Sequence, residues 1–81
     1  MTDKTMLFKF DNKEVKDLKK TLKEVEETLT ERGYNAYNQI VGYLISGDLG
    51  YISSHNDARR KMQELDRAKI VEILLSEFQG K

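Results

Sequence analysis

The sequence contains no cysteine and no proline, and it has a single histidine among its 81 residues. The absence of cysteine excludes disulfides, thiolate metal sites and cysteine nucleophiles. A chain of this length buries only about two-thirds of the surface that its unfolded form exposes. Since disulfides are excluded, regular helices and self-association are the remaining sources of stability. We therefore predict both, the second as a homodimer.

The sequence also lacks an excess of charge of either sign and a long hydrophobic run. Its 14 basic and 14 acidic residues cancel, which argues against general attraction to nucleic acid or to an anionic membrane. The longest apolar run, residues 40–45, is far shorter than the roughly 20 residues of a membrane span. No signal peptide opens the chain. We expect a soluble, cytoplasmic protein without membrane insertion.

Apolar residues at helical spacing dominate the rest of the sequence. The firmest pattern predicts a helix from Asn12 to Arg32, started by Asp11 with Glu14 and ended by Gly33. Its apolar positions recur at alternating steps of three and four residues: Val15, Leu18, Leu22, Val25 and Leu29.

Three further helices are predicted downstream. Residues 35–48 carry one apolar face and stop at Gly47, while Gly42 inside that helix indicates the close approach of another backbone. Residues 49–52 form a short turn or a single helical turn. In the third helix Ser54 and Asp57 act as a capping pair. The fourth follows without a clear break and ends at Gly80. The predicted apolar faces are Tyr37, Ile40, Val41, Leu44 and Ile45; Ala58, Met62 and Leu65; and Ile70, Val71, Leu74, Leu75 and Phe78.

Together these segments predict an all-α fold, a compact bundle of four to five short helices that resembles a helix-turn-helix domain. Residues 12–81 form one helical domain, and residues 1–11 form a flexible N-terminal arm. In the arm Met6, Phe8 and Phe10 alternate with polar residues, but no other strand is predicted to pair with them. They either pack on the bundle as a clamp or present a motif to a partner.

Reactive groups for catalysis are scarce in this sequence. His55 lies near a predicted helix start, without a cysteine or a second histidine to form a nucleophilic pair or a metal site. No glycine-rich phosphate loop is present. We therefore expect no enzymatic activity, no metal and no cofactor.

A basic cluster on the third and fourth helices is the main candidate binding surface. It contains Arg59, Arg60, Lys61, Arg67 and Lys69. Such a cluster could contact DNA from a helix-turn-helix domain, capture a phosphorylated side chain through planar guanidinium groups, or be a solvated face. Because Glu64, Asp66 and Glu72 interrupt it, binding to nucleic acid is the less favoured alternative.

The middle of the chain resembles the IreB/ReoM family of regulatory phosphoproteins of Gram-positive bacteria. The resemblance extends nearly from end to end and is most specific at Gly33-Tyr34-Asn35, residues 38–44, Ser46-Gly47-Asp48, Tyr51-Ile52 and Asp57-Ala58-Arg59. The N-terminal Lys4-Thr5-Met6 is also similar to the short arm of the family. The sequence departs from the family pattern at Ala36 and Leu49, where prolines are usual, and at Gln63, where a basic residue is usual.

The resemblance implies a helical homodimer that is the substrate of a cell-wall-sensing membrane Ser/Thr kinase and of its partner phosphatase. Phosphorylation is implied at Thr5, with Thr2 as a second position. The implied role is control of peptidoglycan synthesis and of tolerance to cell-wall antibiotics, in at least one branch of the family by control of the degradation of an early precursor enzyme by a Clp-type protease. We hypothesise that the phosphate pairs with Arg59 or Arg67, or blocks a partner from using that surface.

Overall fold

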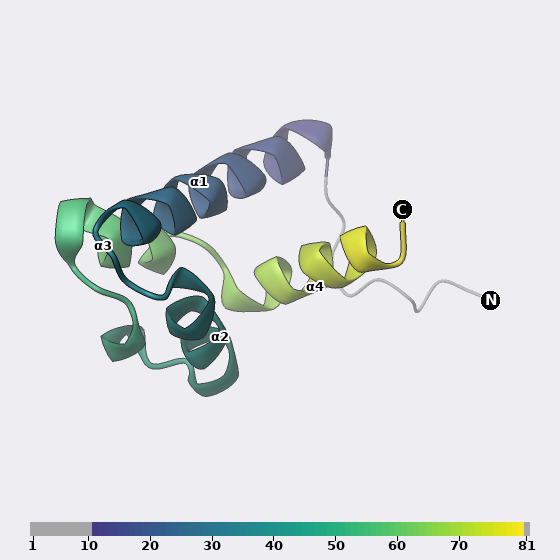
Figure 1. Ribbon diagram of the computed structural model, residues 1–81. Coiled ribbons are helices and arrows are strands. Elements are labelled where there is room, and N and C mark those ends of the chain that lie inside the picture. Colours follow the sequence, from purple (N-terminus) through teal and green to yellow (C-terminus); the bar gives the residue numbers. More distant parts are fainter. Residues whose placement is uncertain (1–10, 81) are drawn as a thin grey trace.

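Residues 11–80 are described by a computed structural model, in which four α-helices and two 3₁₀ turns follow one another (Figure 1). The helices are α1 (Asn12–Glu31), α2 (Ala36–Ser46), α3 (Ala58–Gln63) and α4 (Arg67–Phe78), and the turns are η1 (Leu49–Tyr51) and η2 (His55–Asp57). This arrangement confirms the prediction of an all-α bundle of four to five short helices. The predicted arm, residues 1–11, lies outside the described range apart from Asp11.

Both ends of α1 follow the sequence pattern. The Asp11 carboxylate accepts a hydrogen bond of 2.7 Å from the backbone N–H of Glu14, which satisfies one of the free donors of the first turn. Arg32 ends the helix, and Gly33 follows in the left-handed region with φ of 93°. Only glycine adopts that conformation without a steric cost, so the chain turns there into α2.

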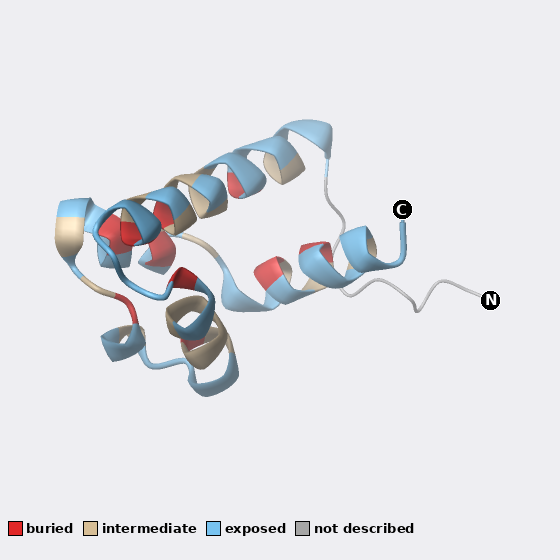
Figure 2. Cartoon of the chain, viewed as in Figure 1, coloured by how far each residue is buried: buried red, intermediate tan, exposed pale blue. Residues whose placement is uncertain are grey.

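The core lies where α1 packs against α2 and α3, and the buried positions cluster on their facing sides (Figure 2). Three of the five predicted apolar positions of α1 are buried, and Val15 and Leu22 pack partly buried beside them. The complete set of buried residues is Leu18, Val25, Leu29, Ala36, Tyr43, Ile52, Ala58, Met62, Ile70 and Ile73. Burial of such side chains stabilises the fold by about 1.5–3 kcal/mol each.

The predicted core face of α2 is wrong in part. Ala36 and Tyr43 are the buried residues of this helix, whereas Tyr37 is 75% and Ile45 is 79% exposed. Apolar residues surround most of α2, so periodicity alone does not determine which arc faces α1. Gly47, with φ of 78°, ends the helix as predicted.

Gly42 does mark a close approach, but to a side chain and not to a backbone. A Cβ atom at this position would lie 2.4 Å from Cδ1 of Tyr51, in η1. The missing side chain therefore makes room for the tyrosine ring.

The predicted capping pair of α3 is wrong. The Ser54 side chain makes no cap hydrogen bond, and its carbonyl accepts from the N–H of Asp57 at 3.2 Å instead. Asn56 and Asp57 both have positive φ, 47° and 64°, a conformation that Asn and Asp tolerate better than most residues. Ala58 and Met62 are buried, as the pattern predicted.

A clear break precedes α4, contrary to the sequence prediction. The Asp66 carboxylate accepts from the backbone N–H groups of Ala68 and Lys69 at 2.9 and 3.2 Å, and starts the helix at Arg67. Ile70 and Ile73 are buried, although Ile73 was outside the predicted face. The other members of that face, Val71, Leu74, Leu75 and Phe78, are exposed. Because only one narrow side of α4 meets the body, most of its apolar stripe remains on the surface.

Candidate functional site

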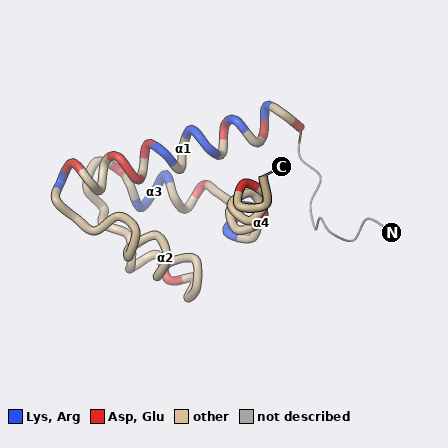
Figure 3. The backbone as a smooth tube through the Cα atoms, turned by 45° about the vertical axis from the view of Figure 1, so that its right-hand side comes forward, with Lys and Arg blue, Asp and Glu red and all other residues tan. Residues whose placement is uncertain are grey.

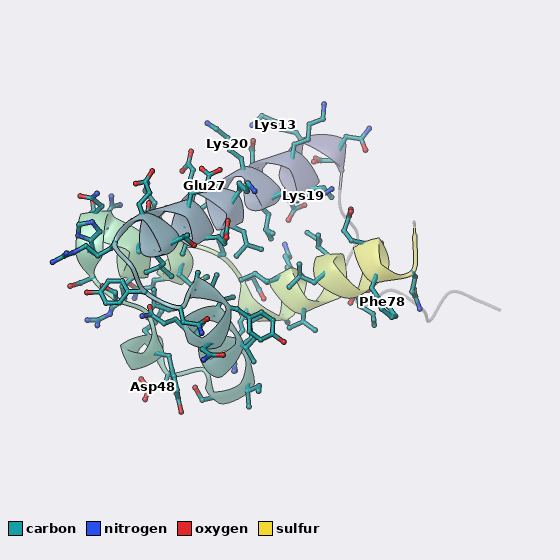
Figure 4. The ribbon with its side chains drawn as sticks, viewed as in Figure 1. Lys13, Lys19, Lys20, Glu27, Asp48 and Phe78 are labelled. Atoms are coloured by element: carbon teal, nitrogen blue, oxygen red, sulfur yellow. The ribbon has the colours of Figure 1, made fainter. Side chains whose placement is uncertain are left out.

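The outer sides of α2 and α4 carry large apolar side chains on the surface. Phe78, the last residue of α4, is 87% exposed and points away from α1 (Figure 4). The segment 36–46 contains no charged residue, in contrast to the alternating charges of α1 (Figure 3). The exposed apolar residues of the two helices are Tyr37, Ile45, Val71, Leu74, Leu75 and Phe78. Exposed apolar surface of this kind marks an interaction site in a small protein.

An apolar groove of 420 Å³ lies between α1, α2 and α4. Its wall is formed by Leu22, Tyr37, Ile40, Val41, Leu44 and Leu74. Lys19, Lys23 and Glu26 of α1 also line it, and their side chains are about half or more exposed to solvent. The groove thus combines an apolar wall with two cations and one carboxylate along one side.

Two ion pairs connect α4 to α1. Lys69 pairs with Glu14 and Lys19 with Glu77, each at 2.7 Å. The hydrogen bond that Lys69 Nζ donates to the Glu14 carboxylate raises the pKa of Lys69 above its usual 10.5. Both pairs are partly exposed, so each contributes little to stability compared with the burial of Ile70 and Ile73. A second cavity of 520 Å³, lined largely by charged residues, lies beside the Glu14–Lys69 pair.

Each of the three arginines of the predicted basic cluster has a partner within the chain. Arg59 Nε donates to the carbonyl oxygen of Ile52 at 2.8 Å, and an Arg67 guanidinium nitrogen donates to that of Leu44 at 3.2 Å. Arg60 pairs with Asp57 at 3.2 Å and with Glu64 at 3.1 Å. These arginines are therefore built into the fold at separate places. Their role toward phosphate stays a prediction.

The remaining predicted residues are two threonines and one histidine. Thr2 and Thr5 lie outside the described residues. The backbone N–H of His55 donates to Ser53 Oγ at 3.1 Å, in the turn before α3. Within residues 11–80 no three histidine, aspartate or glutamate side chains gather as metal ligands would. In the same range, no helix combines the length and apolar character that crossing a membrane requires.

Sequence reasoning missed the groove, although one signal for it was available. A helix without charges, between residues 36 and 46, cannot present a solvated face of the usual kind. The missed contributors are Leu22, which the sequence pattern assigned to the core, and Lys19 and Lys23 of α1. Their position beside α2 follows from the packing of three helices that are distant in sequence.

The described residues form a small helical fold with exposed apolar and charged surfaces. The sequence model of one protein family, described as IreB regulatory phosphoprotein, matches residues 3–79. The chain therefore belongs to the IreB family of regulatory phosphoproteins. This finding confirms the resemblance drawn from the sequence motifs.

Proposed function

We propose that this chain is a non-enzymatic substrate of a cell-wall-sensing Ser/Thr kinase and of its partner phosphatase. Modification at Thr5, with Thr2 as a second position, switches its interaction with a downstream protein. Through that interaction it controls peptidoglycan synthesis and tolerance to cell-wall antibiotics in the cytoplasm. The observation that carries the proposal is membership, over residues 3–79, of a family of regulatory phosphoproteins.

The surface described above supports the choice of protein partners. Exposed aromatic and aliphatic side chains on α2 and α4 suit a protein interface, which is enriched in such residues at its centre. One partner is a second copy of the chain, bound through the outer stripe of α4 with Val71, Leu75 and Phe78. The downstream partner belongs to a Clp-type protease system or is the precursor enzyme that it degrades.

A DNA-binding role has less support. The helix that carries Arg59 and Arg60 is only six residues long, and Arg60 is balanced by two carboxylates. A recognition helix needs several unpaired side chains that reach base edges in the major groove. A duplex gel shift that weakens with salt would reverse this preference.

The test is a strain that lacks the native gene and carries a copy encoding wild type, Thr5→Ala or Thr5→Ser. Thr5→Ala should change growth at a sublethal concentration of a cell-wall antibiotic, because it removes the phosphate acceptor. Thr5→Ser is the matched control, since it keeps a hydroxyl that a Ser/Thr kinase can modify. If all three strains grow alike, the proposed switch is wrong.

A further inference from the structure

The groove between α1, α2 and α4 exposes apolar wall residues that a ligand of matching chemistry would cover. Leu22 and Leu44 are only partly buried, and Leu74 is 43% exposed. No charged side chain from α2 or α4 lines the groove, whereas α1 contributes Lys19, Lys23 and Glu26. The fitting occupant is therefore an apolar segment with a group that can accept from a lysine.

The N-terminal segment, residues 1–10, precedes Asp11, which lies eight residues, or about 12 Å along α1, before Lys19, the first α1 residue that lines the groove. It leads into Asp11, the N-cap of α1, and the next residue, Asn12, shares a side of the helix with Lys19 and Lys23. The shared side follows from the separations of seven and four residues, which are close to whole numbers of helical turns. A segment that leaves α1 at Asp11 and turns back can therefore run along the groove.

The extended segment is long enough to reach the apolar residues of the groove from Asp11. At about 1.5 Å per residue, Leu22 and Lys23 lie about 17 Å along α1 from Asp11. At about 3.3 Å per residue for extended chain, Phe8 reaches about 10 Å from Asp11, Met6 about 17 Å and Thr5 about 20 Å. Met6 and Phe8 lie on one side of such a chain, since side chains alternate. Met6 would therefore reach Leu22, and Thr5 would come level with Lys23.

We propose that residues 5–10 bind in the groove of their own chain, antiparallel to α1, with Met6 and Phe8 against the apolar wall and Thr5 beside Lys23. The ammonium group of Lys23 is accessible to a group on Thr5, because the lysine side chain is 68% exposed and its contact with Glu26 is long, 3.9 Å. A phosphate on Thr5 adds about −1.5 to −2 charge, which Lys23 and Lys19 attract. That last step rests on the proposed function, whereas the docking of Met6 and Phe8 does not.

The arrangement leaves the outer stripe of α4 open to a second copy. Leu74 faces the groove, whereas Val71, Leu75 and Phe78 follow one another along the outside of the helix. Segment binding and self-association thus use neighbouring surfaces of α4.

The test is paramagnetic relaxation in the full, unphosphorylated chain with a nitroxide at Asp3→Cys, which is unique because the sequence has no cysteine. Broadening of the amide signals should be strongest in the second half of α1, near Glu26 and Thr28, and should extend to Tyr37 and Val41 on the facing wall of the groove. The matched variant adds Met6→Ser and Phe8→Ser, two positions outside the described residues, and an unchanged amide spectrum of residues 12–80 checks that its body remains folded. These changes should lower the equilibrium constant for binding of the segment about tenfold or more, because loss of one buried apolar side chain shifts an equilibrium constant by that factor.

Equal broadening in both proteins, or no broadening at these amides, would overturn the proposal. A mixture of spin-labelled unenriched chain with unlabelled ¹⁵N-enriched chain separates the two sources of a segment. Broadening of these amides in that mixture means that the groove binds the segment of a second copy, which also overturns the intramolecular assignment. Since no kinase is involved, failure here leaves phosphorylation at Thr5 untouched, and the growth test above decides that question separately.

Discussion

The guanidinium of Arg67, at the start of α4, donates a hydrogen bond of 3.2 Å to the carbonyl oxygen of Leu44, in the last turn of α2. It lies directly over Gly47, where a Cβ atom would come within 2.8 Å of its nearer nitrogen. A cation beside the end of a helix satisfies a free carbonyl and complements the helix dipole. This contact places α4 against α2 and so helps to shape the groove.

Gly47→Ala should destabilise the protein more than Gly33→Ala does. Both glycines have positive φ, 78° and 93°, so both substitutions carry a backbone cost of about 1–2 kcal/mol. Gly33 has nothing near its missing Cβ, whereas alanine at position 47 must also displace Arg67. The extra cost is the loss of one hydrogen bond, about 0.5–1.5 kcal/mol. Urea unfolding measures the difference, and equal free energies of unfolding would contradict the role of Arg67.

The effect of Gly42→Ala on the stability of the fold should change sign with the residue at position 51. In the wild-type background the new methyl group meets the ring of Tyr51 at 2.4 Å and destabilises the fold. In a Tyr51→Ala background the same change should stabilise it, by up to about 1 kcal/mol, because alanine is the better helix former. A double-mutant cycle by thermal unfolding measures the coupling. Additive effects would show that the ring does not require the glycine.

The contribution of the Glu14–Lys69 pair to stability should depend on pH, in a range that the pKa of Lys69 determines. Its folded pKa is raised above 10.5 by the hydrogen bond to Glu14, so its contribution is full below pH 10.5 and is lost as pH rises through the folded pKa. The wild type should therefore be more stable than Glu14→Gln at neutral pH, and the two should converge in strong alkali. Asp17→Asn tests the same pH dependence at the Lys13–Asp17 pair, where the pKa of Lys13 is also raised. A difference in stability between wild type and Glu14→Gln that stays constant at all pH values would contradict this assignment.

Substitution of a buried residue of α4 should affect folding, whereas substitution of its exposed residues should affect self-association. Ile73 is 4% exposed, and Ile73→Ala should lower the free energy of unfolding by about 2–5 kcal/mol. Leu75 is 54% exposed, and Leu75→Ser together with Phe78→Ser should leave the fold intact. This double variant should instead weaken the homodimer in sedimentation experiments. A dimer of unchanged affinity would place the interface elsewhere.

The sequence predicted α1 well because its start, end and apolar stripe are all local features. Gly33 and Gly47 stop their helices, and Asp11 caps the first, through interactions that span only a few residues. The buried faces of α2 and α4 were harder to predict, because both helices have apolar residues on more than one side. Tyr43 and Ile73 become core residues only through the neighbours that the tertiary fold supplies.

The sequence predicted a binding surface at the basic cluster, whose role toward phosphate stays a prediction, but it did not predict the apolar groove. Arg59 and Arg67 were predicted as phosphate-binding residues from their charge, yet they contact the carbonyl groups of Ile52 and Leu44. Spacing in sequence does not reveal whether a guanidinium group stabilises a turn or remains open to a ligand. The groove depends on α1, α2 and α4 meeting, and no local pattern contains that information.

The central claim is that Thr5 carries a regulated phosphate. Intact-mass spectrometry of the protein from its native host, with fragmentation of the N-terminal peptide, tests it most directly under normal growth and under cell-wall stress. The account predicts a phosphate on Thr5 whose occupancy changes between the two conditions. An N-terminal peptide that is never modified in either condition would contradict it.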